Sequence, residues 1–335
     1  MTIMTSSPVR RGGRPALRLV KTQALSREEW LSVRQRGIGS SDAAAALGLN
    51  PHQSMLELWM IKTGRAHMLP QIDPGDRTTP TYWGSLLEPI VAAHYTYETG
   101  NKVRKVNAVL QHPDPDKTWM LANIDREILS APDVQILECK TAGEYGARAW
   151  REGVPEYVQC QVQHQLAVTG KVAADVCVLI CGQEIKIHRI ERDSELIDGL
   201  IKLEREFWHY VETDTQPPAD GSDSADRALR SLYPHDYGDV VDFRDNRAMS
   251  AAFSDLQTLR DEMATRAQVE QQLKQTIQQM MGSSSRALFE TGTVSWKRSK
   301  DGTQLDVERL KAEHPALFDT YLFPKAGSRR FLIQS

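Results

Sequence analysis

The sequence predicts an α/β fold in which a central mixed sheet is flanked by helices, with a long C-terminal helix and a small α+β appendage. Segments with helical spacing alternate with short β-branched segments between residues 26 and 213. Apolar residues then recur mostly at three- and four-residue steps from Met249 to Met280, which indicates one long amphipathic helix. The appendage is expected to contain a strand, a helix and a strand, at 288–298, 304–313 and 329–334.

The first part of the chain contains most of the expected elements. Helices are expected at 26–35, 42–48, 54–63, 82–98, 155–169 and 194–213. The first begins at a capping box, because Ser26 and Glu29 can satisfy each other's backbone N–H groups. Three strands that form an antiparallel meander are expected at 102–111, 118–128 and 134–140, and two more at 172–181 and 184–191.

These elements divide the chain into four regions. Residues 1–24 are rich in Ser, Thr, Arg and Gly and are expected to be a disordered basic N-terminus. Residues 25–213 would form the α/β core, and residues 214–245, rich in Asp, Pro, Gly and Ser, would be a linker or surface loop. Residues 246–335 would be a C-terminal extension.

Composition limits the classes of protein. The chain has 335 residues, 40% of them hydrophobic, and a net charge of −3, which argues against a protein that coats DNA nonspecifically. Residues 1–36 nevertheless carry eight Arg or Lys residues against two acids, either as a solvated tail or as a local DNA contact. The four cysteines lack paired spacing, and no apolar stretch reaches the roughly 18 residues of a membrane span. A soluble cytoplasmic protein is therefore expected.

The residues most suited to chemistry are Asp125, Glu138 and Lys140. Each follows or ends an apolar strand-like segment, and the two-residue period of a strand puts Glu138 and Lys140 on one face. Carboxylates bind hard divalent cations, and a nearby ammonium can offset charge during phosphodiester hydrolysis. The spacing alone is a weak signal, because many proteins carry such triplets as surface salt bridges.

Two neighbouring helices carry further polar candidates. Glu88, in the sequence W-G-S-L-L-E-P, can contribute another carboxylate, or it can be a solvated helix acid. The segment P-E-Y-V-Q-C-Q-V-Q-H-Q-L-A-V-T-G carries four glutamines and His164 on one helix. A neutral amide can hold a phosphate or water through both donor and acceptor. Because these side chains cannot all face one direction, at least half are expected on the surface.

These motifs in this order resemble the YqaJ-like viral recombinases, which include lambda exonuclease and belong to the PD-(D/E)-x-K nuclease superfamily. The motifs are W-L-S-V-R-Q-R-G-I-G-S-S-D, G-S-L-L-E, I-D with I-L-E-C-K, and Y-V-Q-C-Q-V-Q-H-Q-L-A-V-T-G. The resemblance covers about residues 26–335 and implies a restriction-endonuclease-like core. Residue 124 is Ile124 where the superfamily name has proline, a departure that the superfamily tolerates.

The resemblance also implies roles for particular residues. Asp125 and Glu138 would bind Mg²⁺, helped by the carbonyl group of Cys139, with Lys140 beside the attacking water. Glu88 would lie near a second metal ion. Mn²⁺ would be able to replace Mg²⁺, and Gln161 would match the active-site glutamine of the family.

Arg34 and Ser41, with the neighbouring Ser40, would hold the 5′-phosphate of the strand being degraded. A guanidinium and a hydroxyl can form charge-assisted bonds to such a phosphate. The alternative for Arg34 is an ion pair with Glu28 or Glu29 on its own helix.

As a function, the resemblance implies a 5′-to-3′ exonuclease on linear double-stranded DNA that leaves 3′ single strands for recombination by strand annealing. It further implies a ring-shaped trimer, a single-strand annealing protein as partner, and a phage or prophage origin in a bacterial cytoplasm. Two alternatives stay open: an endonuclease or repair nuclease of the same fold, and a non-catalytic DNA-binding recombination scaffold.

Overall fold

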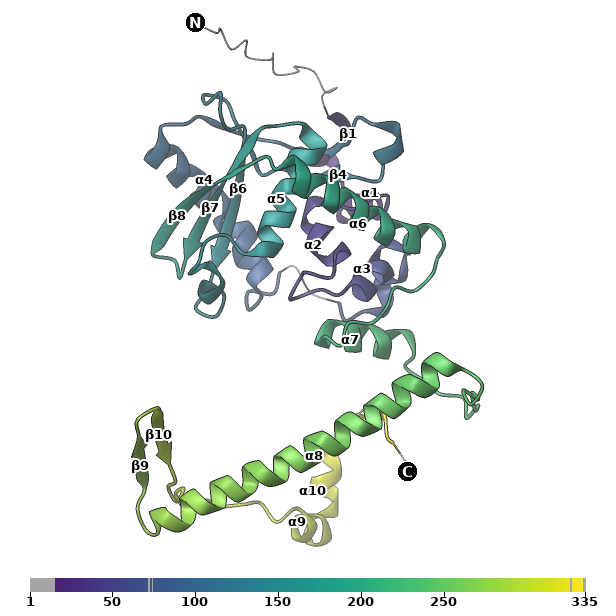
Figure 1. Cartoon of the computed structure of the whole chain (residues 1–335), viewed down its shortest axis with the longest axis vertical. Coiled ribbons are helices and arrows are strands. Elements are labelled where there is room, and N and C mark those ends of the chain that lie inside the picture. Colours follow the sequence, from purple (N-terminus) through teal and green to yellow (C-terminus); the bar gives the residue numbers. More distant parts are fainter. Residues whose placement is uncertain (1–15, 72, 74, 326, 334–335) are drawn as a thin grey trace, which may run out of the picture. The chain divides into compact units, whose positions relative to one another are not determined.

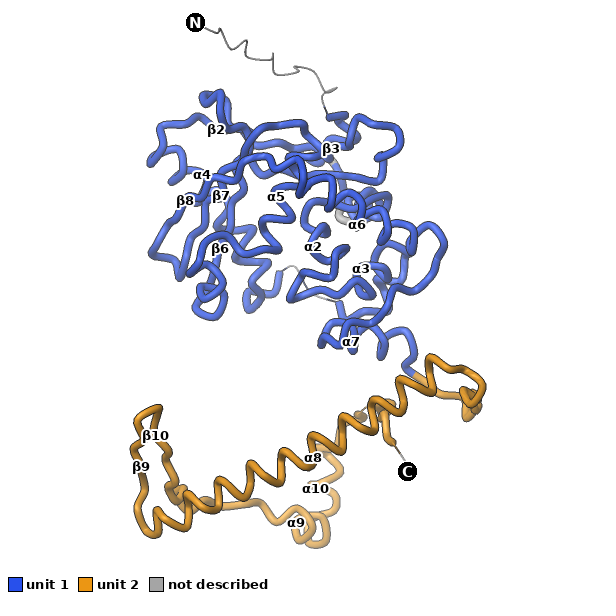
Figure 2. The backbone as a smooth tube through the Cα atoms, in the orientation of Figure 1, with its two compact units in different colours: residues 1–234 blue, residues 235–335 orange. Residues whose placement is uncertain are grey.

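The computed structural model describes residues 16–71, 73, 75–325 and 327–333 of the chain. The chain forms two compact units, residues 1–234 and residues 235–335 (Figure 2). The first unit holds all the predicted site residues, and the second holds the long helix α8 (Figure 1).

The main sheet of the first unit has the strand order β2–β5–β6–β7–β8. Its strands are β2 (Val103–Lys105), β5 (Arg126–Ile128), β6 (Ile136–Ala142), β7 (Ala173–Ile180) and β8 (Glu184–Glu191). Strands β6 and β7 run parallel, and the other neighbouring pairs are antiparallel. The predicted α/β fold with a mixed sheet is therefore confirmed.

Helices cover both faces of this sheet, α4 (Pro80–Thr99) on one and α5 (Glu156–Thr169) on the other. Val91 of α4 lies against Cys177 of β7 in one buried cluster. The next residue along the strand on either side faces the opposite way, and Val176 and Val178 share a cluster with Val162 of α5. Because successive side chains of β7 point to opposite faces of the sheet, α4 packs on one side of this strand and α5 packs on the other.

A second sheet, of order β1–β3–β4, lies in the same unit; its strands are β1 (Leu17–Lys21), β3 (Ala108–Gln111) and β4 (Leu121–Ala122). The prediction of disorder for residues 1–24 is wrong for β1, and residues 1–15 lie outside the described part. Strand β1 pairs antiparallel with β3, which supplies partners for its backbone groups. Its alternating sequence, L-R-L-V-K, is typical of a half-exposed edge strand.

Two of the predicted strands are each divided between the two sheets. The segment 102–111 forms β2 in the main sheet and β3 in the small one, and the segment 118–128 forms β4 and β5. The chain leaves one sheet and enters the other at residues 123–125, which are outside both strands. Asp125 therefore occupies the joint between the two sheets, directly before β5.

The remaining helices of the first unit pack on α5 or on one another (Figure 1). They are α1 (Arg27–Gln35), α2 (Ala43–Ala46), α3 (Met55–Lys62), α6 (Ser194–Glu212) and α7 (Asp223–Leu232), with short 3-10 turns η1 (Thr22–Ala24), η2 (Ser40–Asp42), η3 (Arg65–Met68), η4 (Pro115–Lys117) and η5 (Gly146–Trp150). The capping box expected at Ser26 and Glu29 is present at the start of α1.

The helix α7 lies inside the segment 214–245 that the sequence indicated as a linker. Its Ser224 donates a hydrogen bond of 2.6 Å to Glu57 of α3, and Ala225 and Ala228 are buried. The core unit therefore continues to residue 234, because the small residues of α7 allow it to pack on α3.

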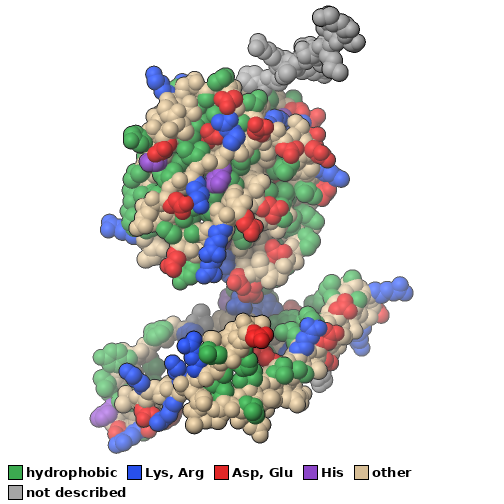
Figure 3. Space-filling model, turned by 60° about the vertical axis from the view of Figure 1, so that its left-hand side comes forward, with side chains coloured by type: hydrophobic (Ala, Val, Ile, Leu, Met, Phe, Trp, Pro, Cys, Tyr) green, Lys and Arg blue, Asp and Glu red, His purple; other side chains and the backbone are tan. Residues whose placement is uncertain are grey.

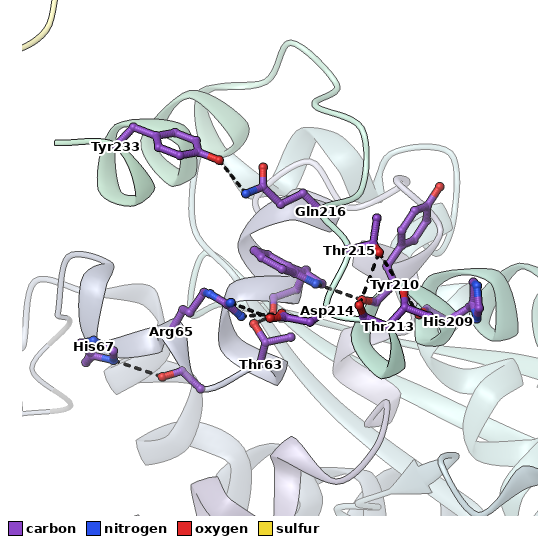
Figure 4. Close-up of polar contacts among 12 residues, drawn as sticks. Thr63, Arg65, His67, His209, Tyr210, Thr213, Asp214, Thr215, Gln216 and Tyr233 are labelled. Carbon is purple, nitrogen blue, oxygen red and sulfur yellow. Dashed lines mark hydrogen bonds and ion pairs between the residues drawn. The ribbon is translucent and has the colours of Figure 1, made fainter. Parts of the chain in front are cut away.

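Polar contacts fix the chain where it leaves α6 (Figure 4). Arg65 of η3 makes two hydrogen bonds, of 2.7 and 2.8 Å, to the carboxylate of Asp214, and its guanidinium lies 4.6 Å from the ring centroid of Trp59. The amide of Gln216 donates to the hydroxyl of Tyr233 at 2.6 Å. This part of the expected linker is therefore held to the unit that precedes it.

The second unit contains the predicted long helix, α8 (Arg247–Met281), which is confirmed, followed by β9 (Arg286–Phe289), β10 (Gly292–Ser295), α9 (Val307–Glu313) and α10 (Pro315–Thr320). The expected strand 288–298 is instead a hairpin that turns at Glu290 and Thr291. The predicted strand at 329–334 is wrong for its described residues, 329–333, which have no strand pairing. Residue 334 lies outside the described part.

On the face of the first unit that Figure 3 presents, Lys and Arg side chains are interspersed with Asp and Glu. This pattern fits the small net charge of −3 and puts any DNA contact on local groups instead of bulk charge. Within the described ranges, none of the helices has the length and apolar character needed to cross a membrane.

Candidate active site

The candidate active site is built where β6 meets the joint before β5. Glu138 and Lys140 are two residues apart on β6, and Nζ of Lys140 lies 2.8 Å from Oε1 of Glu138. Asp125 lies directly before the neighbouring strand β5, and its Oδ2 accepts a hydrogen bond of 2.9 Å from the backbone N–H of Cys139. The pairing of β5 with β6 thus brings a second carboxylate to the edge of the E-C-K sequence.

Two glutamines of α5 hold the Glu138 carboxylate from the other side. Gln161 donates to Oε1 at 2.6 Å and Gln165 donates to Oε2 at 2.8 Å. Gln161 also accepts a hydrogen bond of 2.8 Å from Lys140. The amide of Gln161 therefore fixes the carboxylate and the ammonium relative to each other, and Gln165 fixes the second carboxylate oxygen.

Burial and charge set the ionisation of these groups. Burial and the neighbouring Glu138 raise the pKa of Asp125 to about 7. Burial alone would lower the pKa of Lys140, but Glu138 outweighs it and the net shift is upward. Lys140 therefore carries its proton, and a positive charge, at neutral pH.

The donor set suits a hard divalent cation. The carboxylates of Asp125 and Glu138 repel each other, so a bound cation would stabilise their charged forms. Oxygen ligands are those that Mg²⁺ prefers. Asp125 and Glu138 supply such ligands, and the Cys139 carbonyl directly follows Glu138 in sequence. In the part of the chain that the structure describes, no three His, Cys, Asp or Glu side chains stand close enough to hold a metal together.

Glu88 of α4 reaches the neighbourhood of this site, but its carboxylate is engaged. Oε1 of Glu88 accepts a hydrogen bond of 2.5 Å from Arg126 and lies 3.6 Å from the ammonium of Lys105. Arg126 also donates to the backbone carbonyl of Asp125 at 2.8 Å. The structure therefore links Glu88 to Asp125 through Arg126, a residue that the sequence did not single out.

The loop between α1 and α2 brings Arg34 and Ser41 together. One guanidinium nitrogen of Arg34, Nη2, donates to Ser41 Oγ at 3.0 Å and to Asp42 Oδ1 at 2.5 Å. Ser41 is exposed, whereas Ser40 is buried and donates to the carbonyl of Asn123 at 3.4 Å. Ser40 therefore faces the joint between the sheets and does not accompany Ser41 towards solvent.

The ion pair of Arg34 differs from the alternative that the sequence left open. Its partner is Asp42, and neither Glu28 nor Glu29 pairs with it among the described contacts. Glu29 accepts a hydrogen bond from the backbone N–H of Ser26 at 2.8 Å, so its carboxylate is occupied by the helix cap.

Backbone hydrogen bonds join this loop to the segment that carries Asp125. Ile38 donates to the carbonyl of Trp119 at 2.7 Å, and Leu121 donates to the carbonyl of Ile38 at 2.8 Å. The buried His164 of α5 then lies 2.8 Å from the carbonyl oxygen of Leu121. The phosphate-binding candidates and the carboxylate pair are therefore tied to one short stretch, residues 119–125.

Comparisons with known proteins agree with these motifs. The model of the YqaJ-like viral recombinase domain matches residues 29–172. The protein YqaJ of Bacillus subtilis (strain 168) is 33% identical over 311 residues, which cover 90% of this chain and 92% of that protein. The chain belongs to the YqaJ-like viral recombinase family. The resemblance found in the sequence is thus confirmed, and membership of this family supports a nuclease role.

Solved structures similar to this YqaJ-family chain include an alkaline exonuclease from Laribacter hongkongensis. It is 23% identical, with a TM-score of 0.45, and the match covers 56% of this chain and 94% of that one. A phage-related exonuclease from Haemophilus somnus 129PT is 12% identical, with a TM-score of 0.39, over 55% of this chain and 99% of that one.

The YqaJ-family chain thus brings together most, but not all, of the residues selected from its sequence. Asp125, Glu138, Lys140 and Gln161 form one connected group, and Arg34 and Ser41 form another. Helical spacing could have selected Gln165 as well, because residues four apart lie on the same face of a helix. No sequence signal pointed to Lys62 or Arg126, and Asp42, the last residue of the motif W-L-S-V-R-Q-R-G-I-G-S-S-D, was given no role in the site.

Proposed function

We propose that this chain is a Mg²⁺-dependent exonuclease that degrades one strand of linear double-stranded DNA from its 5′ end and leaves a 3′ single strand. The observation that carries the proposal is the group formed by Asp125, Glu138 and Lys140. It combines the buried carboxylate of Glu138 and the half-buried carboxylate of Asp125 with a protonated amine, which are the components that metal-assisted phosphodiester hydrolysis requires.

Asp125, Glu138 and the Cys139 carbonyl would hold the cation, either Mg²⁺ or Mn²⁺, and Glu88 would serve a second ion. A bound divalent cation supplies Lewis acidity and positive charge at the scissile phosphate. Gln161 and Gln165 keep both oxygens of Glu138 in fixed positions, so that the ligand is oriented before the substrate arrives.

Lys140 would act on the phosphate directly. Because its ammonium is already held by Glu138 and Gln161, it needs no rearrangement to offset the negative charge that develops in the transition state. Arg126, bound to Glu88 and to the Asp125 carbonyl, keeps the chain rigid at the joint that presents Asp125.

Arg34 and Ser41 would bind the terminal 5′-phosphate of the degraded strand. A guanidinium and an exposed hydroxyl joined at 3.0 Å can both donate to phosphate oxygens. The segment 119–125 connects this pair to the carboxylates, which supports end recognition coupled to cleavage. We call the ratio of activity on 5′-phosphate ends to that on 5′-hydroxyl ends the 5′-phosphate preference.

A ring-shaped homotrimer around DNA and a single-strand annealing protein as partner complete the proposal. A closed ring would keep a chain with a net charge of −3 on DNA by topology. Light scattering at working concentration tests the ring, and a monomer would contradict it.

The decisive experiment mixes the full chain with Mg²⁺ and three substrates: linear duplex labelled at the 5′ end, linear duplex labelled at the 3′ end, and covalently closed circular duplex. Early release of the 5′ label, with the circle intact, is the expected result. Cleavage of the circle would indicate an endonuclease. Binding without cleavage of any substrate would indicate a recombination scaffold.

A further inference from the structure

Asp42 forms the centre of a buried charge cluster behind the proposed phosphate-binding pair. Its side chain is 6% exposed, and each of its oxygens is occupied: Oδ1 by Arg34 at 2.5 Å, and Oδ2 by Lys62 at 2.6 Å and the backbone N–H of Gly39 at 3.0 Å. Lys62 comes from α3, and its side chain is only 1% exposed. A buried carboxylate with this many donors is a fixed point in the fold.

Arg34 is held by this fixed point on one side only. Its Nη2 is shared by Asp42 and Ser41, and the ring of Trp30 lies 4.8 Å from the guanidinium carbon. In the described part of the chain its Nε and Nη1 make no hydrogen bond, and 28% of the side chain is exposed. The guanidinium is therefore anchored at one nitrogen and keeps its other donors available.

We propose that Asp42 is a positioning residue for the 5′-phosphate site: it orients Arg34 so that the unbonded guanidinium N–H groups and Ser41 face the terminal phosphate. Lys62 supports the same arrangement without touching the guanidinium, because its ammonium donates to Asp42 Oδ2 at 2.6 Å and to the backbone carbonyl of Arg34 at 2.8 Å. This inference rests on the proposed end recognition by Arg34 and Ser41.

The charges of the cluster favour an orienting role. Arg34 and Lys62 contribute two positive charges against one negative charge of Asp42, so one positive charge is left for an anion. Burial alone would raise the pKa of Asp42, but Arg34 and Lys62 outweigh it, and Asp42 stays ionised at neutral pH. If the site worked by charge alone, removing Asp42 would strengthen phosphate binding; if Asp42 orients Arg34, removing it must weaken the discrimination.

The test uses a double variant, Asp42→Leu with Lys62→Met, which removes both buried charges and leaves the net charge of the cluster unchanged. Replacing a buried ion pair with apolar side chains is often tolerated, whereas removing one partner leaves an unpaired buried charge. Binding is measured in EDTA with a hairpin duplex that has one blunt end, carrying either a 5′-phosphate or a 5′-hydroxyl. Cleavage therefore does not enter the measurement.

We expect wild type to bind the phosphorylated end about ten-fold more tightly, because a terminal phosphate accepts charge-assisted hydrogen bonds that a 5′-hydroxyl cannot. The double variant should bind both ends within about two-fold of each other, as expected when the donors lose their orientation. Asp214→Asn is the matched control, since it breaks another Arg–Asp pair, with Arg65 at 2.7 Å, away from the cluster. It should keep the wild-type ratio.

A folded double variant with the full wild-type ratio would overturn the role of Asp42 while leaving the proposed function intact. A wild-type ratio near one would instead refute end recognition by Arg34, and the role of Asp42 with it. Absence of nuclease activity, which is tested separately, would refute the proposed function without changing this ratio.

If the double variant does not fold, Arg34→Lys supplies the test. Lysine keeps the positive charge but has a single side-chain nitrogen, which Asp42 would bind. It therefore lacks the additional guanidinium nitrogens through which Arg34 can contact the phosphate while it is bound to Asp42. The 5′-phosphate binding ratio should then fall to about two-fold or less. Retention of the wild-type ratio by Arg34→Lys would show that charge alone suffices and would overturn the proposal.

Discussion

The side-chain amide of Gln165 donates a hydrogen bond of 2.8 Å to Oε2 of Glu138, one helical turn after Gln161, which donates to Oε1 at 2.6 Å. The carboxylate is therefore held at both oxygens from one face of α5. Gln165 also donates to the carbonyl of Asn123 at 3.1 Å, beside the joint that carries Asp125. A single buried amide thus connects Glu138 to the segment that carries Asp125.

Gln165→Met should impair the site while keeping the volume of the side chain. Loss of the donor to Glu138 should lower activity or Mg²⁺ affinity by about 10- to 100-fold, the usual effect of removing a partner of a metal ligand. The measurement is the rate of DNA degradation as a function of Mg²⁺ concentration. Gln159→Met is the control, because Gln159 is exposed and its side-chain amide donates to the Val154 carbonyl at 2.7 Å, away from Glu138. Equal Mg²⁺ dependence of both variants would mean that Gln161 alone orients Glu138.

Asp125→Asn should abolish activity and at the same time stabilise the metal-free chain. The pKa of Asp125 in the folded chain is about 7, whereas an unfolded aspartate titrates near 3.9. Between these values the unfolded chain is ionised and the folded carboxyl keeps its proton, so stability falls as pH rises from about 4 to about 7. Asparagine removes this loss, and a gain of ~1 kcal/mol would raise Tm by roughly 2–4 °C at pH 7.

Thermal unfolding in EDTA and in Mg²⁺ measures this effect without an activity assay. Mg²⁺ should raise the Tm of wild type and leave that of Asp125→Asn unchanged, since the variant lacks one ligand. Glu138→Ala and EDTA should each abolish cleavage. Full activity of Asp125→Asn at saturating Mg²⁺ would remove Asp125 from the site.

Lys140→Ala should lower turnover by several orders of magnitude with DNA affinity largely kept. The raised pKa keeps Lys140 protonated. We therefore expect its ammonium to offset negative charge that develops only in the transition state. Single-turnover rates and binding in EDTA separate the two effects. The exposed Lys102→Ala is the control and should match wild type. A fall in affinity without a fall in turnover would reduce Lys140 to a phosphate contact.

Elements with local signals were predicted well from the sequence. The placement of Glu138 and Lys140 on one face of β6 follows from the two-residue period of a strand. The capping box of Ser26 and Glu29 lies within four consecutive residues. The long helix α8 follows from its apolar spacing. In each case the deciding contacts lie within one element.

Features that depend on distant partners were missed. The joint at Asp125 exists because the chain changes sheets, and the hydrogen bonds that separate β4 from β5 go to strands elsewhere in the sequence. Asp42 meets Lys62 across 20 residues, and no spacing rule relates them. The helix α7 was mistaken for linker because its packing on α3 uses alanine and serine, which give a weak apolar signal.

Gly37→Ala tests how tightly the loop of Arg34 is held against the joint. A Cβ at residue 37 would lie 2.3 Å from the carbonyl oxygen of Trp119, a backbone atom that cannot rotate away. Overpacking of this kind costs about 1–3 kcal/mol. Gly199→Ala is the matched control: it lies within α6 with no atom near the added Cβ, and alanine there should stabilise by roughly 0.5–1 kcal/mol.

Denaturant unfolding measures the free energy of unfolding of both variants, which should fall for Gly37→Ala and rise for Gly199→Ala. We also expect Gly37→Ala to reduce the 5′-phosphate preference, because the loop that carries Ser41 must shift. Equal free energies of unfolding for Gly37→Ala and wild type would show that the segment containing Trp119 can move. That result would contradict a rigid connection between the Arg34–Ser41 pair and the Asp125–Glu138–Lys140 group.

The last prediction concerns the direction of degradation. Arg34 donates to Ser41 at 3.0 Å, and this pair is proposed to receive a terminal 5′-phosphate. A terminal phosphate accepts charge-assisted bonds that a 5′-hydroxyl cannot, each worth roughly 1.5–3 kcal/mol, so phosphorylated duplex should be degraded about ten-fold or more faster.

Arg34→Ala should lose most of this preference and keep residual cleavage, because Asp125, Glu138 and Lys140 do not contact Arg34. Initial rates on matched duplexes with the two 5′ ends measure the ratio for each protein. Arg36→Ala is the control, since Arg36 is exposed two residues further along the same chain segment and makes no ion pair with a described residue. It should keep the wild-type ratio. Equal rates on both ends for wild type would sink end recognition, and an endonuclease of the same fold would then be the better account of the Asp125–Glu138–Lys140 group.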